Sequence, residues 1–375
     1  MKTRLLSVAI TCGVAFSLCA QGLAPELEKE ARASIDKGLA WLKVQQKPSG
    51  AWSDEGAPAL TALPLWAIVS SGSKEYAAET DKAVAFLCSR QQADGGIYVP
   101  VPGRPGGGLG NYNTAVCLAA LHATGRRDVT PVVLKAREYV ASSQLTGDDH
   151  YAGGFGYDKD SGRRYADLNN AVFSMDAMRR TQGAEDLRPA GEKRADLDWD
   201  AALKYVSNMQ VKEGETEGGF AYNLNEQQRG SPGAAAGTAA DARPMLRAYG
   251  SISYAGLLAL VHSRLEKSDP RVRSAIEYCS RFWTLEENPG QGQQGLYFYY
   301  NIMARSLGAA GLDALPKHEA EGSVKWREDV VRKVISLQKP DGSWVNENNR
   351  WWENDPVLAT AYSLLALEFA AGITK

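Results

Sequence analysis

Apolar and polar residues follow the spacing of paired helices, most clearly near the C-terminus. Over residues 330–337 the apolar positions fall on one side, as in a helix with its other side in water. Pro340 and Gly342 end this helix, because proline lacks an amide donor and glycine accepts a positive φ. Asp355 then begins a second helix as its N-cap, and residues 357–367 are apolar on nearly all sides. Such a pair can bury its surface only against further copies of itself.

The same unit recurs through the chain. One-sided helices are predicted at 34–46, 82–92, 135–144, 201–210, 272–283 and 330–337. Each is followed by a turn glycine, at Gly50, Gly96, Gly154, Gly219, Gly295 or Gly342. Apolar helices are predicted at 59–69, 113–123, 166–179, 249–262, 297–307 and 357–367. Six pairs favour a closed double ring, although open superhelices also stack helix pairs.

The spacing of the units is uneven because loops are inserted at one place in each unit. The insertions at 99–110, 224–244 and 288–294 are rich in Gly, Pro, Ala or Gln. The connection at 183–197 is charged, and we expect a solvated loop there between two units.

The N-terminus predicts export. Lys2 and Arg4 precede an apolar run over residues 5–18, and the small residues Cys19 and Ala20 follow, which is the pattern of a secretory signal. We expect a signal peptide at 1–20, cleaved near Ala20, and a single domain over 26–375 in a periplasmic or secreted protein. An uncleaved membrane anchor is the alternative, although the run is short for crossing a bilayer.

Charge and composition exclude other classes of partner. A net charge of -2 provides no basic surface for nucleic acid. After the signal, no apolar stretch approaches the ~20 residues of a transmembrane helix. Cys88, Cys117 and Cys279 are too few and too far apart for a disulfide framework, so we interpret them as buried small hydrophobic residues.

A helix ending in Gln, followed by Gly and an aromatic residue, occurs five times. The segments are KGLAWLKVQQKPSGAW, KAVAFLCSRQQADGGIY, KAREYVASSQ…GGFGY, ALKYVSNMQ…GGFAY and VRKVISLQKPDGSW. Over nearly the whole mature chain this pattern resembles the repeat of squalene-hopene cyclases and prenyltransferase β-subunits, although the fifth unit has Trp283 in place of Gln. The resemblance implies an all-α fold, an (α/α)6 toroid of six outer and six inner helices around a central cavity. Most of the repeated Gln and Trp residues would then be structural.

The catalytic motifs of those families are missing. Residues 196–200 do not match the Asp-x-Asp-Asp of squalene-hopene cyclases, and 296–307 lacks the zinc-binding Cys of the prenyltransferases. The histidines, His122, His150, His262 and His318, show no ligand spacing. We therefore predict no metal and no other cofactor. Any enzymatic activity would be of the terpenoid-cyclase kind by resemblance only.

In such a toroid the glycine loops and the inner-helix N-termini gather at one mouth. Asp167 and Asp355 are the candidate catalytic residues there, although either could simply cap a helix. The candidate ligand-binding residues are Trp52, Tyr112, Tyr157, Asn170, Tyr249, Tyr297, Tyr300, Asn301, Trp344, Arg350, Trp351 and Trp352. Tyr222 and Glu353 are also expected at the mouth.

Three functions remain open. The first is a cavity for an isoprenoid-like or other elongated apolar small molecule. The second is a carbohydrate-active hydrolase or lyase, which requires two carboxyl groups at a defined separation. The third is a non-catalytic scaffold that binds a protein partner.

Overall fold

The computed structural model describes residues 22–104, 107–159, 161–224, 246–318 and 321–374. The predicted signal at 1–20 and nearly all of the insertion at 224–244 lie outside the described residues.

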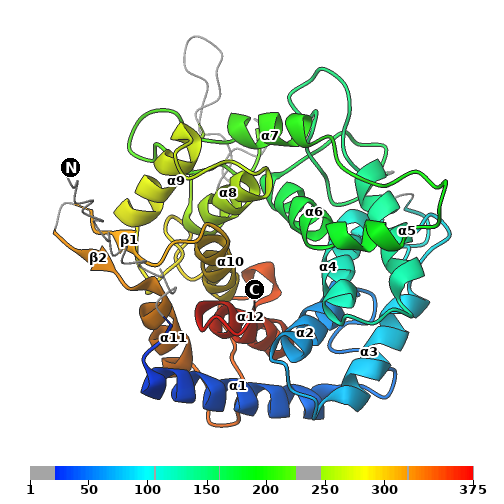
Figure 1. Cartoon of the computed structure of the whole chain (residues 1–375), viewed down its shortest axis with the longest axis horizontal. Coiled ribbons are helices and arrows are strands. Elements are labelled where there is room, and N and C mark those ends of the chain that lie inside the picture. The colour runs from blue at the N-terminus through cyan, green and yellow to red at the C-terminus, as the bar shows by residue number, and fades with distance from the viewer. Residues whose placement is uncertain (1–21, 105–106, 160, 225–245, 319–320, 375) are drawn as a thin grey trace, which may run out of the picture.

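Within the described residues, twelve α-helices form two concentric rings (Figure 1). The outer helices are α1 (Pro25–Gln45), α3 (Ala77–Ser89), α5 (Thr130–Ser142), α7 (Trp199–Asn208), α9 (Pro270–Arg281) and α11 (Trp326–Ser336). The inner helices are α2 (Ala59–Ser70), α4 (Gly110–Ala123), α6 (Leu168–Arg180), α8 (Gly250–His262), α10 (Leu296–Ala309) and α12 (Pro356–Ala370). Each inner helix packs on the next, and α12 packs on α2, so the ring is closed. This is the predicted (α/α)6 toroid.

Smaller elements lie in the connections. The 3-10 helices are η1 (Gln182–Leu187) and η3 (Arg350–Trp352). Strands β1 (Leu315–Pro316) and β2 (Ser323–Val324) pair antiparallel between α10 and α11.

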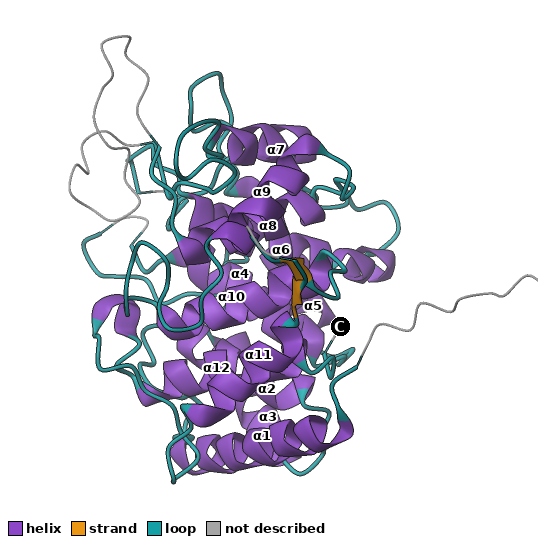
Figure 2. Ribbon diagram, turned by 90° about the vertical axis from the view of Figure 1, so that its left-hand side faces the viewer, coloured by secondary structure: helices purple, strands orange, loops and turns teal. Residues whose placement is uncertain are grey.

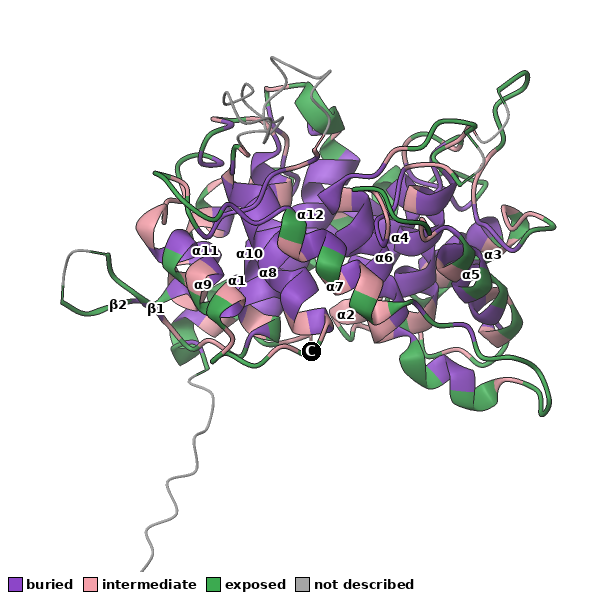
Figure 3. Cartoon of the chain, turned by 90° about the horizontal axis from the view of Figure 1, so that it is seen from above, coloured by how far each residue is buried: buried purple, intermediate pink, exposed green. Residues whose placement is uncertain are grey.

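The two kinds of helix differ in burial as their sequences predict. Helix α1 buries Leu27, Ala31, Ile35 and Leu39, which recur every four residues on one face. Helix α12 is buried on all sides from Val357 to Ala370. Figure 3 shows the same contrast, with buried inner helices and outer helices that expose one side. The core is therefore the layer between the rings together with the interior of the inner ring.

The repeated glutamine joins neighbouring units. Gln46 Nε2 donates to the carbonyl of Gly50 in its own turn (3.0 Å) and to that of Glu79 in the next outer helix (2.8 Å). Gln91, Gln144 and Gln210 form the same pair of bonds.

The last glutamine closes the ring with the same bonds. Gln338 Nε2 donates to the carbonyls of Gly342 and Ser34 (2.9 Å each), and Ser34 Oγ donates back to Gln338 Oε1 (2.8 Å). Because Ser34 lies on α1, the sixth unit is joined to the first. The interpretation of the glutamines as structural is confirmed.

The repeated tryptophans are structural as well. Trp52 and Trp344 are fully buried, and their indole N–H groups donate to the carbonyls of Leu42 and Val334 (2.8 Å each). Their backbone N–H groups donate to hydroxyls of the inner helices, those of Thr61 and Thr360. Trp52 and Trp344 were predicted to bind a ligand, and this prediction is corrected. Both rings instead fill the space between an outer and an inner helix.

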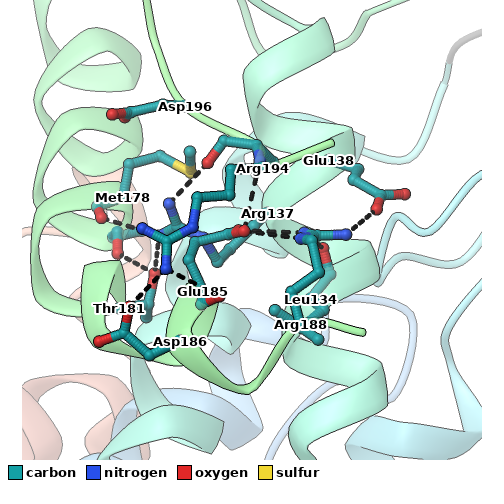
Figure 4. A network of polar contacts seen from close by, with 12 residues as sticks. Leu134, Arg137, Glu138, Met178, Thr181, Glu185, Asp186, Arg188, Arg194 and Asp196 are labelled. Carbon is teal, nitrogen blue, oxygen red and sulfur yellow. Dashed lines mark hydrogen bonds and ion pairs between the residues drawn. The ribbon is translucent and has the colours of Figure 1, made fainter. Parts of the chain in front are cut away.

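The charged connection at 183–197 is exposed over most of its length, as predicted, but Glu185 and Ala195 are buried and anchor it. It folds onto α5, where Arg137 is only 1 % exposed (Figure 4). The Arg137 guanidinium donates to Glu185 Oε1 (2.7 Å), to Thr181 Oγ1 (2.6 Å) and to the carbonyls of Met178 and Ala195 (2.8 Å each). Arg188 adds a bond to Glu185 Oε2 (2.6 Å). The buried charges are paired, and the pairing fixes the connection.

Glu368 on α12 is a buried carboxyl without a compensating partner. Both carboxyl oxygens lack a hydrogen bond within the described residues, and the side chain is fully buried. Burial alone raises the pKa of Glu368 well above its ordinary value and so favours the neutral form of the carboxyl. A carboxyl in this state lowers the stability of the fold at neutral pH.

Replacing this carboxyl, by Glu368→Met, is expected to stabilise the protein by ~2 kcal/mol at pH 7. The unfolded chain releases the proton near pH 4, whereas the folded chain keeps it to higher pH. The free-energy cost of keeping Glu368 protonated in the folded chain is therefore absent below the pKa of Glu368 in the unfolded chain. It grows as pH rises toward the pKa of Glu368 in the folded chain. Urea unfolding of both proteins at pH 4.5 and 7 measures this difference. A gain that is the same at both pH values would contradict the assignment.

Two further sequence predictions can be compared with the described residues. Cys88, Cys117 and Cys279 carry free thiols; Cys117 and Cys279 are buried and Cys88 is half-buried. In the described part of the chain, none of the helices combines the length and apolar character needed to cross a bilayer.

Candidate functional site

The N-termini of the inner helices meet on one side of the ring, away from the C-terminus (Figure 2). Each receives an oxygen from a capping side chain. The capping pairs are Asn113–Ala59 N (2.9 Å) on α2, Asp158–Gly110 N (2.7 Å) on α4, Asp167–Asn170 N (2.8 Å) on α6, Asn288–Ser251 N (2.8 Å) on α8, Glu353–Phe298 N (2.7 Å) on α10 and Asp355–Val357 N (2.8 Å) on α12. The acceptors satisfy amides that helix ends leave unpaired. Most polar residues at this mouth therefore have a structural role.

A cavity of about 220 Å³ opens at this mouth, and the first turns of all six inner helices line it. Nine of the 21 described residues that line it are aromatic. The aromatic residues are Tyr112, Tyr157, Phe173, Tyr222, Tyr249, Phe298, Trp351, Trp352 and Tyr362. Among the described residues of the lining, Glu353 is the single carboxylate, and none is Lys, Arg or His.

The rings of the wall contact one another in sequence from the rim inward. The centroid distances are 6.4 Å for Trp351–Tyr222, 6.3 Å for Tyr157–Tyr112, 5.2 Å for Tyr112–Phe173, 6.0 Å for Phe173–Phe298 and 5.6 Å for Phe298–Tyr362. The hydroxyls of Tyr157 and Tyr222 lie 2.9 Å apart and complete the series. The wall is thus a continuous aromatic surface built from several repeats.

Two tryptophans form the exposed rim of the cavity. Trp351 and Trp352 are 45 % and 54 % exposed, and both have left-handed backbones, with φ of 62° and 64°. For residues other than glycine this conformation costs about 1–3 kcal/mol each. The capping carboxylates Glu353 and Asp355 follow directly and fix the chain behind them. Exposed rings held in a strained backbone are typical of a binding surface.

An ionic cluster fills the ring beneath the aromatic wall. Helix α6 carries Phe173 in the wall and Asp176 one turn further on, where Arg180 (2.9 Å), Arg305 and His262 (2.8 Å) contact its carboxylate. Burial acts to raise the pKa of Asp176, but the two guanidinium groups hold it well below its usual range. The Arg305 guanidinium lies 4.8 Å from the centre of the Trp66 ring. This buried, paired layer lies outside the cavity.

The candidate acid Asp167 lies behind the wall. It is fully buried and accepts from Asn170 N (2.8 Å) and Asn170 Nδ2 (2.7 Å). Burial raises the pKa of Asp167 to about 6, while hydrogen bonds from Asn170, Tyr165 and Tyr222 act in the opposite direction. It does not line the cavity. Its chemical route to a ligand would pass through the hydroxyls of Tyr222 and Tyr157.

The second candidate acid, Asp355, is a half-buried cap. Its Oδ1 accepts from Val357 N (2.8 Å), and Ser53 donates to its other oxygen. It does not line the cavity either. We expect Asp355→Ala to lower the free energy of unfolding by ~1 kcal/mol, as for loss of a helix cap. Urea unfolding measures this loss; a folded variant that no longer binds a ligand of the cavity would show instead that Asp355 acts in function.

The other predicted ligand-binding residues divide into two groups. Tyr112, Tyr157, Tyr249, Trp351 and Trp352 line the cavity. The residues outside it, besides Trp52 and Trp344, are Asn170, Tyr297, Tyr300, Asn301 and Arg350.

Most residues in the second group have local contacts, whereas the buried side-chain amide of Asn301 has no hydrogen-bond partner within the described residues. Asn170 is buried against Asp167, and Tyr300 donates its hydroxyl to the carbonyl of Leu285 (2.6 Å). Tyr297 and Asn301 are buried on faces of α10 that turn away from the cavity, which Phe298 reaches. Arg350 is exposed and stacks on Trp351, with its guanidinium 4.4 Å from the ring centre.

The wall also contains residues that the sequence did not single out. These residues are Phe173, Phe298, Tyr362, Leu60 and Leu358, which lie in helices that are apolar on nearly all sides. Their register provides a signal, because the second or third residue of each inner helix faces the cavity. Aligning the six N-caps would have found Leu358 and Phe298.

Comparisons with known proteins agree on the fold. Comparison with protein-family models gives no match, and comparison with curated proteins gives none. A substrate complex of a variant of type II terpene cyclase MstE from Scytonema aligns over 93% of this chain and 100% of its own, with 13% identity and a TM-score of 0.57. An inactive variant of the α-1,6-mannanase GH76A of Salegentibacter sp. HEL1_6 aligns over 93% and 99%, with 12% identity and a TM-score of 0.57.

These similarities define the class of the fold. The chain has the α/α-toroid fold that this terpene cyclase and this mannanase share, as its Gln-Gly-aromatic repeats predicted. At 12–13% identity the similarity concerns the fold alone, because one toroid scaffold carries unrelated chemistries.

Proposed function

We propose that this chain is an exported protein that binds an elongated apolar small molecule, isoprenoid-like in character, in the aromatic cavity at the mouth of the toroid. The single observation that carries the proposal is the continuous aromatic wall from Trp351 to Tyr362. Aromatic surface of this kind, with a few polar groups among it, is typical of small-molecule sites. The terpene cyclase of similar fold was solved with geranylgeranyl dihydroxybenzoate, an elongated molecule.

The size of the cavity limits how the ligand lies. At about 220 Å³ it falls below the ~300–1,000 Å³ of typical ligand pockets. One end of an elongated ligand would fill it, and the remainder would lie in the mouth against Leu109, Trp351 and Trp352.

Binding is favoured over hydrolysis by the carboxyl groups of the site. Glycoside hydrolysis needs two carboxyls flanking one bond. Among the described residues of the lining, Glu353 is the single carboxyl, and its oxygens already accept from Phe298 N (2.7 Å), Tyr297 N (3.2 Å) and Asn346 Nδ2 (2.8 Å). The alternative of a carbohydrate-active toroid therefore rests on fold similarity to the mannanase alone.

The experiment is a binding titration with an isoprenoid alcohol, followed by tryptophan fluorescence, together with native mass spectrometry of the purified protein. Leu60→Trp fills the cavity from α2 and is expected to weaken binding at least tenfold. Val44→Trp adds the same ring on α1 at a position that is 79 % exposed, and should bind like the parent protein. Unchanged binding by Leu60→Trp, or no binding by the parent, would refute the proposal. Release of reducing sugar from an oligosaccharide would favour the hydrolase instead.

A further inference from the structure

The electrostatic character of the cavity points to the charge of the ligand. Its described lining contains nine aromatic residues and one carboxylate, Glu353, and contains no cationic side chain. Arg350 is the nearest cation along the chain to the rim; it is exposed and does not line the cavity. Its guanidinium already stacks on Trp351, at 4.4 Å from the ring centre, so the rim ring accepts a cation within the protein itself.

The positive ends of the inner helices do not make the mouth cationic. Six inner-helix N-termini contribute about +3 in all, at about half a charge each. Four of the six caps are carboxylates, those of Asp158, Asp167, Glu353 and Asp355, and together they contribute -4 when ionised. Burial raises the pKa of Asp158, Asp167 and Glu353, and Arg350 adds one positive charge at the rim, so the mouth is close to neutral and not cationic. An anionic ligand would find no Lys or Arg in the described lining to pair with.

Glu353 is placed to act on a bound cation. It is fully buried and lines the cavity between the rim tryptophans and the α10 N-terminus. Phe298, Trp351 and Trp352 line the same cavity. Aromatic faces around a carboxylate are the groups that recognise a quaternary ammonium ion, whose charge is spread over apolar methyl groups.

We propose that the ligand of this cavity carries a cationic head of the quaternary ammonium class, which the aromatic wall and Glu353 bind inside the ring while its apolar tail lies in the mouth. The inference rests on the proposed function and adds the chemistry of the ligand's inner end. It also explains the small volume of the cavity, because a trimethylammonium group with the first carbons of a tail needs little space.

The test compares three amphiphiles with the same ten-carbon chain, each below its micelle concentration, by isothermal titration calorimetry. Decyltrimethylammonium is expected to bind at least tenfold more tightly than 1-decanol, and decyl sulfate more weakly than either. Added salt should weaken binding of the cation and leave that of the alcohol unchanged.

Two kinds of variant separate charge from apolar contact. Glu353→Gln keeps the shape and an acceptor for the α10 amides, and should weaken the cation about tenfold but not the alcohol. Glu347→Gln is the matched control: it makes the same change in the same loop, at an exposed residue outside the lining. Phe298→Leu tests a ring of the inner wall independently of the Glu353 charge, and leucine keeps an apolar side chain at this half-buried position. It should weaken the cation fivefold or more and change the alcohol less.

The outcomes distinguish the two proposals. If the alcohol binds as tightly as the cation, or if decyl sulfate binds most tightly, the cationic head is refuted while the apolar cavity stands. If none of the three binds, both proposals fail. Equal losses for cation and alcohol in Phe298→Leu would show that the ring supplies apolar contact alone, which also refutes the inference.

Discussion

Replacing Gly342 with alanine is expected to lower the free energy of unfolding by ~3 kcal/mol or more. Gly342 has φ of 97°, and a Cβ atom there would lie 2.6 Å from the carbonyl oxygen of Lys37 on α1. The substitution therefore adds a left-handed alanine and pushes the sixth unit away from the first. The bond from Gln338 to Ser34 would be lost with it. Equilibrium urea unfolding followed by far-UV circular dichroism measures the loss.

Gly72→Ala provides the matched control for this prediction. Gly72 has φ of 73° and open space around its Cα, so alanine there costs only the left-handed backbone, ~1 kcal/mol. Gly153→Ala, at a joint between two internal units, has its added Cβ 2.1 Å from the carbonyl of Ala201 and should resemble Gly342→Ala. If Gly342→Ala costs no more than Gly72→Ala, the joint between the first and last units does not hold in solution.

The helix pairs could be predicted because each kind of helix leaves its own pattern. Residues 357–367 were expected as an apolar helix, and α12 covers Pro356–Ala370. Helix α1 begins at Pro25, nine residues before the predicted start at 34. Its first turns are dominated by charged residues, which hide the regular spacing of Leu27 and Ala31.

The residues that line the cavity wall were harder to predict from the sequence. An inner helix is apolar on all sides, so its sequence retains no period that separates cavity-facing residues from those facing neighbouring helices. Trp344 and Phe298 are both aromatic residues near a turn glycine, yet Trp344 fills the core and Phe298 lines the cavity. Residue type predicted that aromatics gather at the mouth but not the direction in which each side chain points.

The buried ion pair that anchors the connection at 183–197 could not be predicted from the sequence, for a different reason. Its charges predicted a solvated loop, because isolated charges stay in water. Their partner Arg137 lies on α5, 48 residues before Glu185, and no local pattern announces the pair. Long-range pairing of this kind becomes visible only when the chain is folded.

Removing that partner, by Arg137→Met, is expected to lower the free energy of unfolding by about 3–5 kcal/mol. Methionine fills similar space but donates no hydrogen bond, so the carbonyls of Met178 and Ala195 lose their bonds to Arg137, and Glu185 retains only Arg188 as a close cation. The connection should then detach from α5 and become a site of early proteolysis.

Arg126→Met is the matched control, because Arg126 pairs with Asp81 and Asp128 at the surface, where such pairs contribute about 0–1 kcal/mol. Urea unfolding and limited proteolysis of both variants measure the difference. Equal, small losses would mean that the buried network of Figure 4 does not hold the connection in place.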